Sequence, residues 1–242
     1  MTAEPTDPSA IAPGPPLVTR LAAETLGSGV LGGTVIASGI MATLISDDGG
    51  VQLLINAVAT GAALTVLILV LGPVSGAQLN PAVTAALAAD GRVPLREILP
   101  TVAAQLVGFA LGAVVANLMF GGAAVSISTT VRGGPGLLLG EVVATAGLVA
   151  VILTLVARDQ RAWIPAAVGL YITSAYFATS STSFANPGIT LGRMLSDSFA
   201  GIAPESAPLF VAAQLVGAAI GVLVVRLLIV PRGRRGLSSI AT

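Results

Sequence analysis

The chain has 242 residues, of which 55% are hydrophobic and 9% are charged, and its formal net charge is zero. Soluble globular domains carry about 25% charged residues, so this composition excludes a water-soluble domain and predicts that a lipid bilayer is the solvent. The chain has no cysteine and no histidine, which excludes disulfides, thiol or histidine metal sites and histidine proton relays. No basic face indicates nucleic acid, and we expect neither a metal nor a cofactor.

The first sixteen residues are rich in proline, and residues 1–16 are expected to form a disordered tail. They lack the basic start of a signal peptide, so the first apolar segment is expected to remain as a membrane helix. Six long apolar segments follow, each close to the roughly 20 residues that span a bilayer core. They cover residues 17–45, 51–71, 95–120, 136–157, 163–180 and 205–230. Residues 17–230 therefore form the predicted membrane domain, and 231–242 form a C-terminal tail.

Two short segments interrupt this pattern, and each begins with asparagine followed by proline. Asparagine is preferred as a helix N-cap and proline at the first helical position, so each segment predicts a helix start. About ten residues follow in each case, and they rise about 15 Å, roughly half of a bilayer core. We therefore predict two half-length helices. They start at the triplets Asn80-Pro81-Ala82 and Asn186-Pro187-Gly188.

The chain also contains an internal repeat. The heptapeptide 102–108 returns letter for letter as 211–217, and Glu24 corresponds to Glu141. Each copy holds three long segments, an odd number, so the second copy enters the membrane from the opposite side. The copies cover about 17–120 and about 136–230.

An inverted repeat brings the N-termini of the two half-helices together near the membrane midplane. Each N-terminus carries roughly half a positive charge, and two of them facing a narrow lumen repel cations and protons. The side-chain amides of Asn80 and Asn186 are expected to donate hydrogen bonds to a neutral oxygen. The predicted object is a pore for small uncharged molecules.

The placement of the basic residues predicts the orientation. With the N-terminus in the cytoplasm, nine of the eleven arginines lie on or near the inner side, and only Arg132 and Arg193 lie outside. We therefore expect a multi-pass protein of the plasma (inner) membrane with both termini in the cytoplasm.

The run from Gly72 to Thr84, GPVSGAQLNPAVT, resembles the first signature loop of the aquaporin (major intrinsic protein) family. Glu24 and Glu141 resemble the glutamates of the family's first and fourth spans, and the resemblance covers residues 17–230. It implies an all-α membrane protein with six transmembrane helices, two re-entrant half-helices and an inverted repeat in a right-handed bundle. It also implies a pore in every subunit and a homotetramer.

In this family the narrowest point is an outer selectivity filter of four residues, which we place by spacing. Thr60 lies twenty residues before the first motif's asparagine, and Ser183 lies three residues before Asn186. The position in the fifth span falls on Ser174, twelve residues before Asn186, whereas a second count gives Tyr176. Ser174 is preferred, and both alternatives stay open.

The fourth filter position departs from the family. Ile189 stands where arginine is usual, and Gly188 stands where alanine is usual, so we expect a wider filter with less charge. Without that arginine, cation exclusion is expected to depend mainly on the half-helix termini. Arg193 lies one turn further and lines the outer vestibule in one interpretation, whereas in the other it is solvated and paired with Asp197. Gln78, where many relatives carry histidine, is placed at the inner approach.

Two glutamates, Glu24 and Glu141, lie within predicted spans, where carboxylates are costly and usually have a role. We expect a structural role, in which each accepts hydrogen bonds from the backbone of a signature loop. Gln105 and Gln214 are expected to act likewise. Glycines spaced four apart are expected to allow close helix packing. They are Gly29 with Gly33, Gly108 with Gly112, and Gly217 with Gly221.

Ile189 together with the run 183–187 resembles the aquaporins associated with bacterial arsenic-resistance operons. That resemblance implies a passive channel for glycerol-like polyhydroxy molecules and undissociated arsenous acid, with water also passing. One alternative is a water-selective aquaporin that uses Arg193 in its filter. Another is a coupled secondary transporter, because inverted repeats and broken helices occur there too. No nucleotide-binding loop or nucleophile constellation is present, so an enzyme is not expected.

Overall fold

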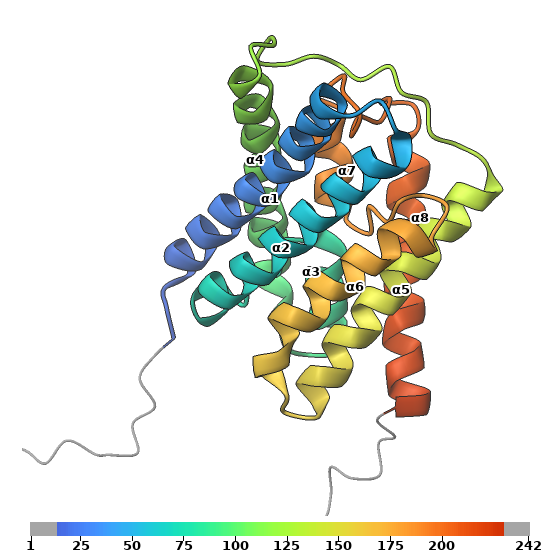
Figure 1. Ribbon diagram of the computed structural model, residues 1–242. Helices are drawn as coiled ribbons and strands as arrows, with labels where there is room; N and C mark the ends of the chain where they lie inside the picture. Colours follow the sequence, from blue (N-terminus) through green and yellow to red (C-terminus); the bar gives the residue numbers. More distant parts are fainter. Residues whose placement is uncertain (1–13, 230–242) are drawn as a thin grey trace, which may run out of the picture.

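The computed structural model describes residues 14–229, and its regular structure in that range is entirely helical (Figure 1). The helices are α1 (Leu17–Ile45), α2 (Gly49–Ser75), α3 (Pro81–Ala89), α4 (Leu95–Met119), α5 (Pro135–Ala157), α6 (Ile164–Ala178), α7 (Pro187–Arg193) and α8 (Ala207–Val224). A 3-10 turn, η1 (Arg161–Trp163), precedes α6, and a π-helical turn, η2 (Val225–Ile229), follows α8. All six long helices and both half-helices are present, which confirms the all-α fold. Residues 231–242 and most of 1–16, predicted as tails, lie outside the described range.

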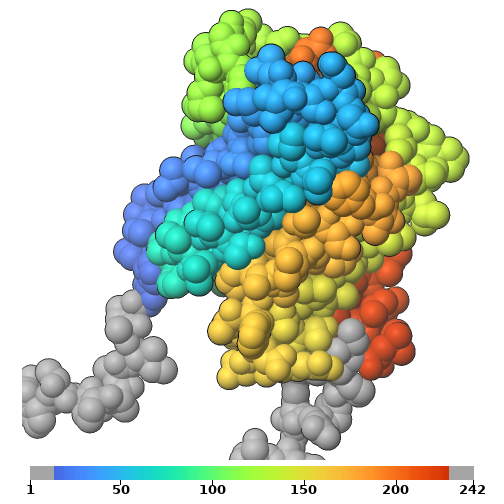
Figure 2. Space-filling model, in the orientation of Figure 1, coloured from blue at the N-terminus to red at the C-terminus, as the bar shows by residue number. Residues whose placement is uncertain are grey.

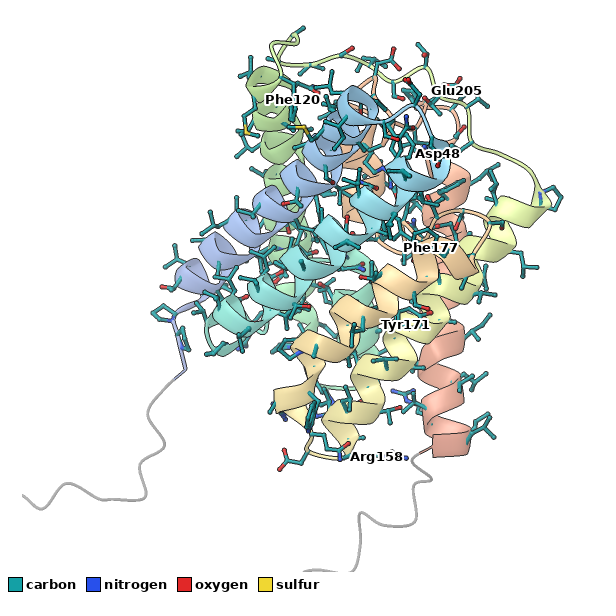
Figure 3. The ribbon with its side chains drawn as sticks, viewed as in Figure 1. Asp48, Phe120, Arg158, Tyr171, Phe177 and Glu205 are labelled. Atoms are coloured by element: carbon teal, nitrogen blue, oxygen red, sulfur yellow. The ribbon has the colours of Figure 1, made fainter. Side chains whose placement is uncertain are left out.

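The second long helix is longer at both ends than the predicted 51–71. Asp48 (Figure 3) caps its start, because its Oδ1 accepts a hydrogen bond of 2.8 Å from the Val51 N–H. The helix continues through Pro73, where a proline removes only one backbone hydrogen bond, and ends at Gly76. Gly76 takes the left-handed conformation with φ 87°, which glycine adopts without steric cost.

Five helices in the described range are long and apolar enough to cross a membrane, namely α1, α2, α4, α5 and α8 with η2. The sixth predicted span, residues 163–180, is shorter in the structure. Its helix α6 has 15 residues, about 22 Å of rise, and ends at Thr179 in extended conformation. It nevertheless belongs to the bundle, because it packs against α2 and α5.

The packing of the helices repeats between the two halves of the chain. In the first half α1 packs against α2 and α4, and in the second half α5 packs against α6 and α8. Contacts between α2 and α6 join the halves, and α1, α2 and α6 lie side by side on one face of the molecule (Figure 2). Each half-helix also contacts the opposite half of the chain: α3 packs against α5 and α8, and α7 packs against α1 and α4. The two halves are therefore interlocked at their half-helices.

Glycines set the closest helix contacts, as the small-residue spacing predicted. A Cβ atom on Gly108 would overlap the carbonyl oxygen of Thr25, and one on Gly112 would overlap that of Gly29, so α1 and α4 pack backbone against backbone. The contact between α5 and α8 is built in the same way. A Cβ on Gly217 would lie 2.5 Å from the Val142 carbonyl oxygen.

This packing predicts that Gly112→Ala destabilises the protein by about 1–3 kcal/mol, because the added methyl group has no free space. Gly72→Ala is the matched control: it also lies inside a helix, and its added Cβ meets nothing within 4 Å. Gly72 is half-buried, and replacing a helical glycine by alanine where the methyl group has free space stabilises by up to about 1 kcal/mol. Thermal unfolding of the purified variants in detergent measures both. Equal melting temperatures would contradict the packing argument.

Candidate functional site

The two half-helices start as predicted, with an asparagine N-cap followed by proline. The Oδ1 of Asn80 accepts hydrogen bonds from the N–H groups of Ala82 (2.9 Å) and Val83 (3.4 Å). The Oδ1 of Asn186 accepts hydrogen bonds from the N–H groups of Gly188 (2.9 Å) and Ile189 (3.2 Å). The helices have nine and seven residues, or about 13 and 10 Å of rise, so both are shorter than the predicted ten residues.

The two asparagines also connect the half-helices to each other. The Nδ2 of Asn80 donates to the carbonyl oxygen of Ala185, and the Nδ2 of Asn186 donates to that of Leu79, both at 2.8 Å. One hydrogen of each amide is therefore used by the protein. Because an amide NH₂ carries two hydrogens, the second remains for a solute at the cavity that both side chains line.

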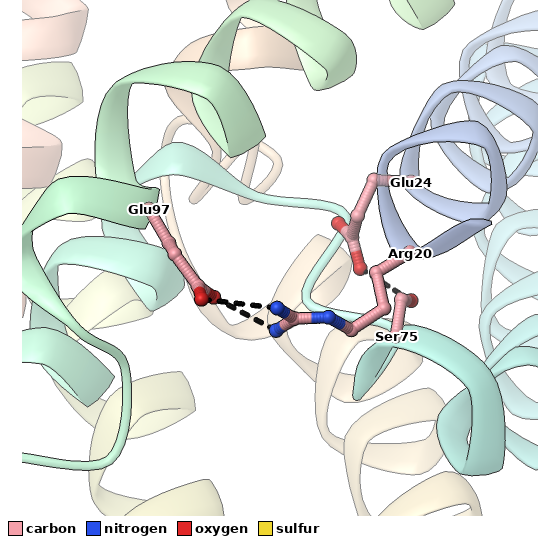
Figure 4. A network of polar contacts seen from close by, with 4 residues as sticks. All are labelled: Arg20, Glu24, Ser75 and Glu97. Atoms are coloured by element: carbon pink, nitrogen blue, oxygen red, sulfur yellow. Dashed lines mark hydrogen bonds and ion pairs between the residues drawn. The ribbon is translucent and has the colours of Figure 1, made fainter. Parts of the chain in front are cut away.

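The loop before α3 is held by Glu24 of α1, which is 2% exposed. One carboxylate oxygen accepts from the Ser75 hydroxyl (2.7 Å) and the Gln78 N–H (2.9 Å), as Figure 4 shows for Ser75. The other accepts from the Leu79 N–H and from the Gln105 Nε2, both at 2.8 Å. These bonds match the expected structural role of Glu24. Gln105 does not accept from the loop backbone as expected, but donates to the Glu24 carboxylate and to the Thr84 hydroxyl.

Glu141 of α5 holds the loop before α7 in the same way. Its two oxygens accept from the N–H groups of Phe184 and Ala185, both at 2.9 Å, and from the Nε2 of Gln214 at 2.5 Å. Gln214 also donates to the Thr190 hydroxyl of α7. The two carboxylates thus occupy equivalent places in the two repeats.

Both loops contain non-glycine residues in the left-handed backbone region, which the sequence did not reveal. The φ angles are 44° at Ala77, 48° at Leu79, 51° at Ser183 and 47° at Ala185. Such residues cost about 1–3 kcal/mol each and persist where surrounding bonds fix them. The four positions correspond in pairs between the two repeats, so the two loops have the same backbone shape.

A cavity of about 950 Å³ is lined by residues from both repeats. One end lies at the starts of α1 and α4, beside Arg20 and Glu97, whose ion pair has N···O distances of 2.7 and 3.0 Å (Figure 4). The asparagines of both motifs and Gln78 line it further along. The Gln78 Oε1 is buried and has no hydrogen-bond partner among the described residues, which fits the expected polar inner approach.

The other end of the cavity holds three of the four predicted filter positions. Thr60, Ser183 and Ile189 all line it, but Ser174 is exposed and does not. The preference for Ser174 was therefore wrong, and Tyr176, which the second count gave, lines the cavity and stays the predicted filter residue of this helix. Side chains two positions apart on a helix point about 200° apart around the helix axis, so only one of these two side chains faces the lumen.

The lumen-facing groups at this end differ in their hydrogen bonding. The hydroxyls of Thr60 and Tyr176 lie 3.1 Å apart and bond to each other, joining α2 to α6. The Ser183 hydroxyl is buried and has no partner in the described part of the chain.

Residues 15–183 match the model of one protein family, described as Major intrinsic protein. The chain belongs to the major intrinsic protein family. Members of this family are channels and not enzymes, which confirms the expected class of protein.

Among the relatives of this major intrinsic protein is aquaglyceroporin AqpS of Rhizobium meliloti (strain 1021). The two are 45% identical over 215 residues, which cover 89% of this chain and 92% of that protein. The probable aquaporin AqpM of Archaeoglobus fulgidus is 35% identical over 170 residues, which cover 64% of this chain and 68% of that protein. The X-ray structure of the aquaglyceroporin from Plasmodium falciparum superposes with a TM-score of 0.70 at 24% identity, covering 89% of this chain and 98% of that one. That superposition shows the same fold.

The structure explains why this major intrinsic protein has Gly188 where the family usually has alanine. A Cβ on Gly188 would lie 2.5 Å from the Cδ2 and Cε2 atoms of Phe109, whose ring is fully buried. The same ring lies against Gly32 of α1, and Gly192 of α7 lies against the Cβ and the backbone of Phe109. Ile189 packs beside it in the core and also borders the cavity.

Arg193 is buried, so the interpretation in which it is solvated and paired with Asp197 is wrong. It is 3% exposed and lines the cavity, its Nε donates to the Ala200 carbonyl oxygen, and its Cζ lies 3.4 Å from the centroid of the Phe184 ring. Asp197, the expected partner, instead accepts from the N–H (2.9 Å) and the hydroxyl (3.1 Å) of Thr129. The interpretation that placed Arg193 at the outer end of the pore agrees with this geometry.

A second arginine, Arg132 of the α4–α5 connection, lies against the same ring at 5.3 Å from its centroid. Burial lowers the pKa of Arg132 below its usual value, and the nearby Glu141 carboxylate opposes that shift.

Two glutamate substitutions test the role of the buried carboxylates. Glu24→Gln replaces one accepting oxygen by an NH₂ group that faces N–H donors, so we expect a loss of about 3 kcal/mol of unfolding free energy. The control is Glu97→Gln, which breaks a partly exposed ion pair and is expected to cost less than about 1 kcal/mol. Chemical denaturation in detergent measures both. Similar losses for the two variants would contradict the role of Glu24.

Gly188→Ala is expected to destabilise by about 1–3 kcal/mol, because the methyl group overlaps the Phe109 ring. Phe109→Leu in the same chain opens that space. The loss from Gly188→Ala should therefore shrink in the Phe109→Leu background, as a double-mutant cycle on melting temperature measures. Additive losses would show that the ring does not select glycine at residue 188.

Proposed function

We propose that this protein is a passive channel for small uncharged solutes, above all glycerol-like polyhydroxy molecules, and that water passes as well. One observation carries the proposal: Ile189 lines the cavity where an arginine would otherwise narrow it. The relative AqpS and the structurally similar Plasmodium protein are both described as aquaglyceroporins, which supports the same solute class.

The residues around the filter suit a polyol. Hydroxyl groups of Thr60 and Tyr176 offer donors and acceptors on one part of the lining, and Ile189 offers an apolar surface. A chain of alcohol groups on a carbon backbone needs both kinds of contact. The facing half-helix N-termini oppose the passage of cations and protons at the midplane.

Undissociated arsenous acid is the leading further solute in this proposal. It is a neutral molecule with three hydroxyls at neutral pH, so it makes hydrogen-bonding demands similar to those of glycerol. The chain has no cysteine, so no thiol in the pore captures trivalent arsenic.

We further propose that the channel works as a homotetramer in the plasma (inner) membrane with both termini in the cytoplasm. The described chain starts and ends on the same side of the bundle, because the start of α1 and the end of α8 both lie at the lower side of Figure 1. The distribution of arginines supports the cytoplasm as that side.

Swelling of proteoliposomes in water, glycerol, urea and arsenous acid, measured side by side, tests the proposal. We expect water, glycerol and arsenous acid to pass faster than through empty liposomes. Passage of water alone would favour the water-selective alternative. Uptake of a solute against its gradient would favour a coupled transporter.

Ile189→Arg is expected to lower glycerol flux by about tenfold or more, because a long cationic side chain narrows the filter. Water flux should stay within about twofold, since a water molecule is far smaller. Ile189→Val is the control that keeps the apolar surface and should preserve both fluxes. Equal glycerol flux in the wild type and Ile189→Arg would show that residue 189 does not set the size limit.

A further inference from the structure

Two arginines share one aromatic ring at the outer end of the cavity. Arg193 stacks on Phe184 with its Cζ 3.4 Å from the ring centroid, and the Cζ of Arg132 lies 5.3 Å from the same centroid. Phe184 also packs edge to face against Phe210, with centroids 5.2 Å apart, so the ring is fixed in place.

Within residues 14–229 neither arginine is paired with a carboxylate. The ion pairs found there are Arg20–Glu97, Arg92–Asp90, Arg161–Asp159 and Arg226–Asp90. A buried charge without a partner is costly, so its position normally serves a purpose. The positive charge of Arg193 is therefore directed at the cavity that its side chain lines.

The side chain of Arg193 reaches back toward the filter. Its Cα lies one helical turn beyond Ile189 on α7, but its guanidinium rests on Phe184, which directly follows the filter residue Ser183. The Arg193 Nε donates to the Ala200 carbonyl oxygen, and its two terminal amino groups make no hydrogen bond among the described residues. Ser183 lines the same cavity, and its buried hydroxyl also has no partner among the described residues.

We infer that Arg193 supplies the fixed positive charge of the outer filter, in place of the arginine that is absent at residue 189, and that Arg132 positions it. The guanidinium excludes cations and donates hydrogen bonds to passing oxygens. Because Arg193 starts one turn further out, it leaves the lumen beside Ile189 wider than a side chain at residue 189 would. This inference deepens the proposed function, since it places charge selection and size selection on different residues.

Arg132 acts through the short segment 199–201. Its Nε donates to the Gly201 carbonyl oxygen at 2.7 Å, and its Nη2 donates to the Phe199 carbonyl oxygen at 3.2 Å. The carbonyl between these two, that of Ala200, accepts from Arg193. Arg132 thus holds segment 199–201 in place, and this segment in turn holds Arg193. Arg132 does not itself line the cavity.

The test uses the full chain in proteoliposomes and measures the leak of methylammonium, a small monovalent cation, relative to water flux. Arg193→Gln and Arg193→Ala should raise this ratio by about tenfold or more, because a unit charge in a poorly solvated pore is a large barrier. The double variant Ile189→Arg with Arg193→Ala should bring the ratio back toward the wild type. Arg158→Ala removes an exposed arginine of the turn after α5 (Figure 3) and should change nothing.

If both Arg193 variants leaked cations no faster than the wild type while their water flux was normal, the assignment of Arg193 would be overturned. Size-exclusion chromatography checks that each variant is folded, and Arg193→Gln retains polar packing if Arg193→Ala is unstable. The readout needs no glycerol passage. A wild type that excludes glycerol while Arg193→Gln leaks cations would therefore defeat the polyol proposal and leave this inference standing.

The positioning role of Arg132 makes a separate prediction. Arg132→Ala should raise the cation-to-water ratio less than Arg193→Gln does, and Arg132→Lys, which keeps a donor, should restore part of the selectivity. Combined with Arg193→Gln, Arg132→Ala should add nothing further, because it acts through the residue already lost. A purely structural role would lower the yield of folded channel without changing the ratio, and that outcome would overturn the positioning role.

Discussion

The structure depends on satisfying backbone groups at a depth where no bulk water reaches them. Two loops leave their helices inside the bundle, and irregular backbone there survives only against protein groups or a water-filled cavity. Glu24 and Glu141 provide the acceptors, each taking two consecutive backbone N–H groups. These carboxylates allow the strained left-handed residues of both loops, and hence the pore lining, to exist.

The same contacts join the two repeats into one functional unit. Each motif asparagine caps its own half-helix and donates to a carbonyl of the opposite loop. Each half-helix also packs against long helices of the other repeat. Neither repeat alone would bring the two asparagines to one cavity, so the pore is a property of their interface.

The sequence predicted most of the fold because its signals are local. Asn-Pro pairs, apolar length and glycine spacing located the helices, and the repeat identified both carboxylates. The errors concern the directions of side chains. The choice of Ser174 over Tyr176 depended on helical register, and α6 is shorter than its apolar run suggested. The position of Arg193 depends on Phe184 and on the carbonyl of Ala200, and the choice of glycine at residue 188 depends on Phe109. The contact with Phe109 joins distant segments, and the contacts of Arg193 depend on how the chain folds on either side of α7, so no helical pattern shows either of them.

The hydroxyls at the outer end bear on how long a solute stays. Thr60 and Tyr176 are already bonded to each other, which uses one hydroxyl hydrogen and one lone pair, so the pair keeps one hydrogen and its other lone pairs for a solute. The Ser183 hydroxyl has no partner in the described range, but its oxygen is buried and does not meet a solute directly. A lining whose hydroxyls are partly bonded to each other holds a solute briefly, and brief residence is what rapid conduction requires, because a site that binds too tightly becomes a trap.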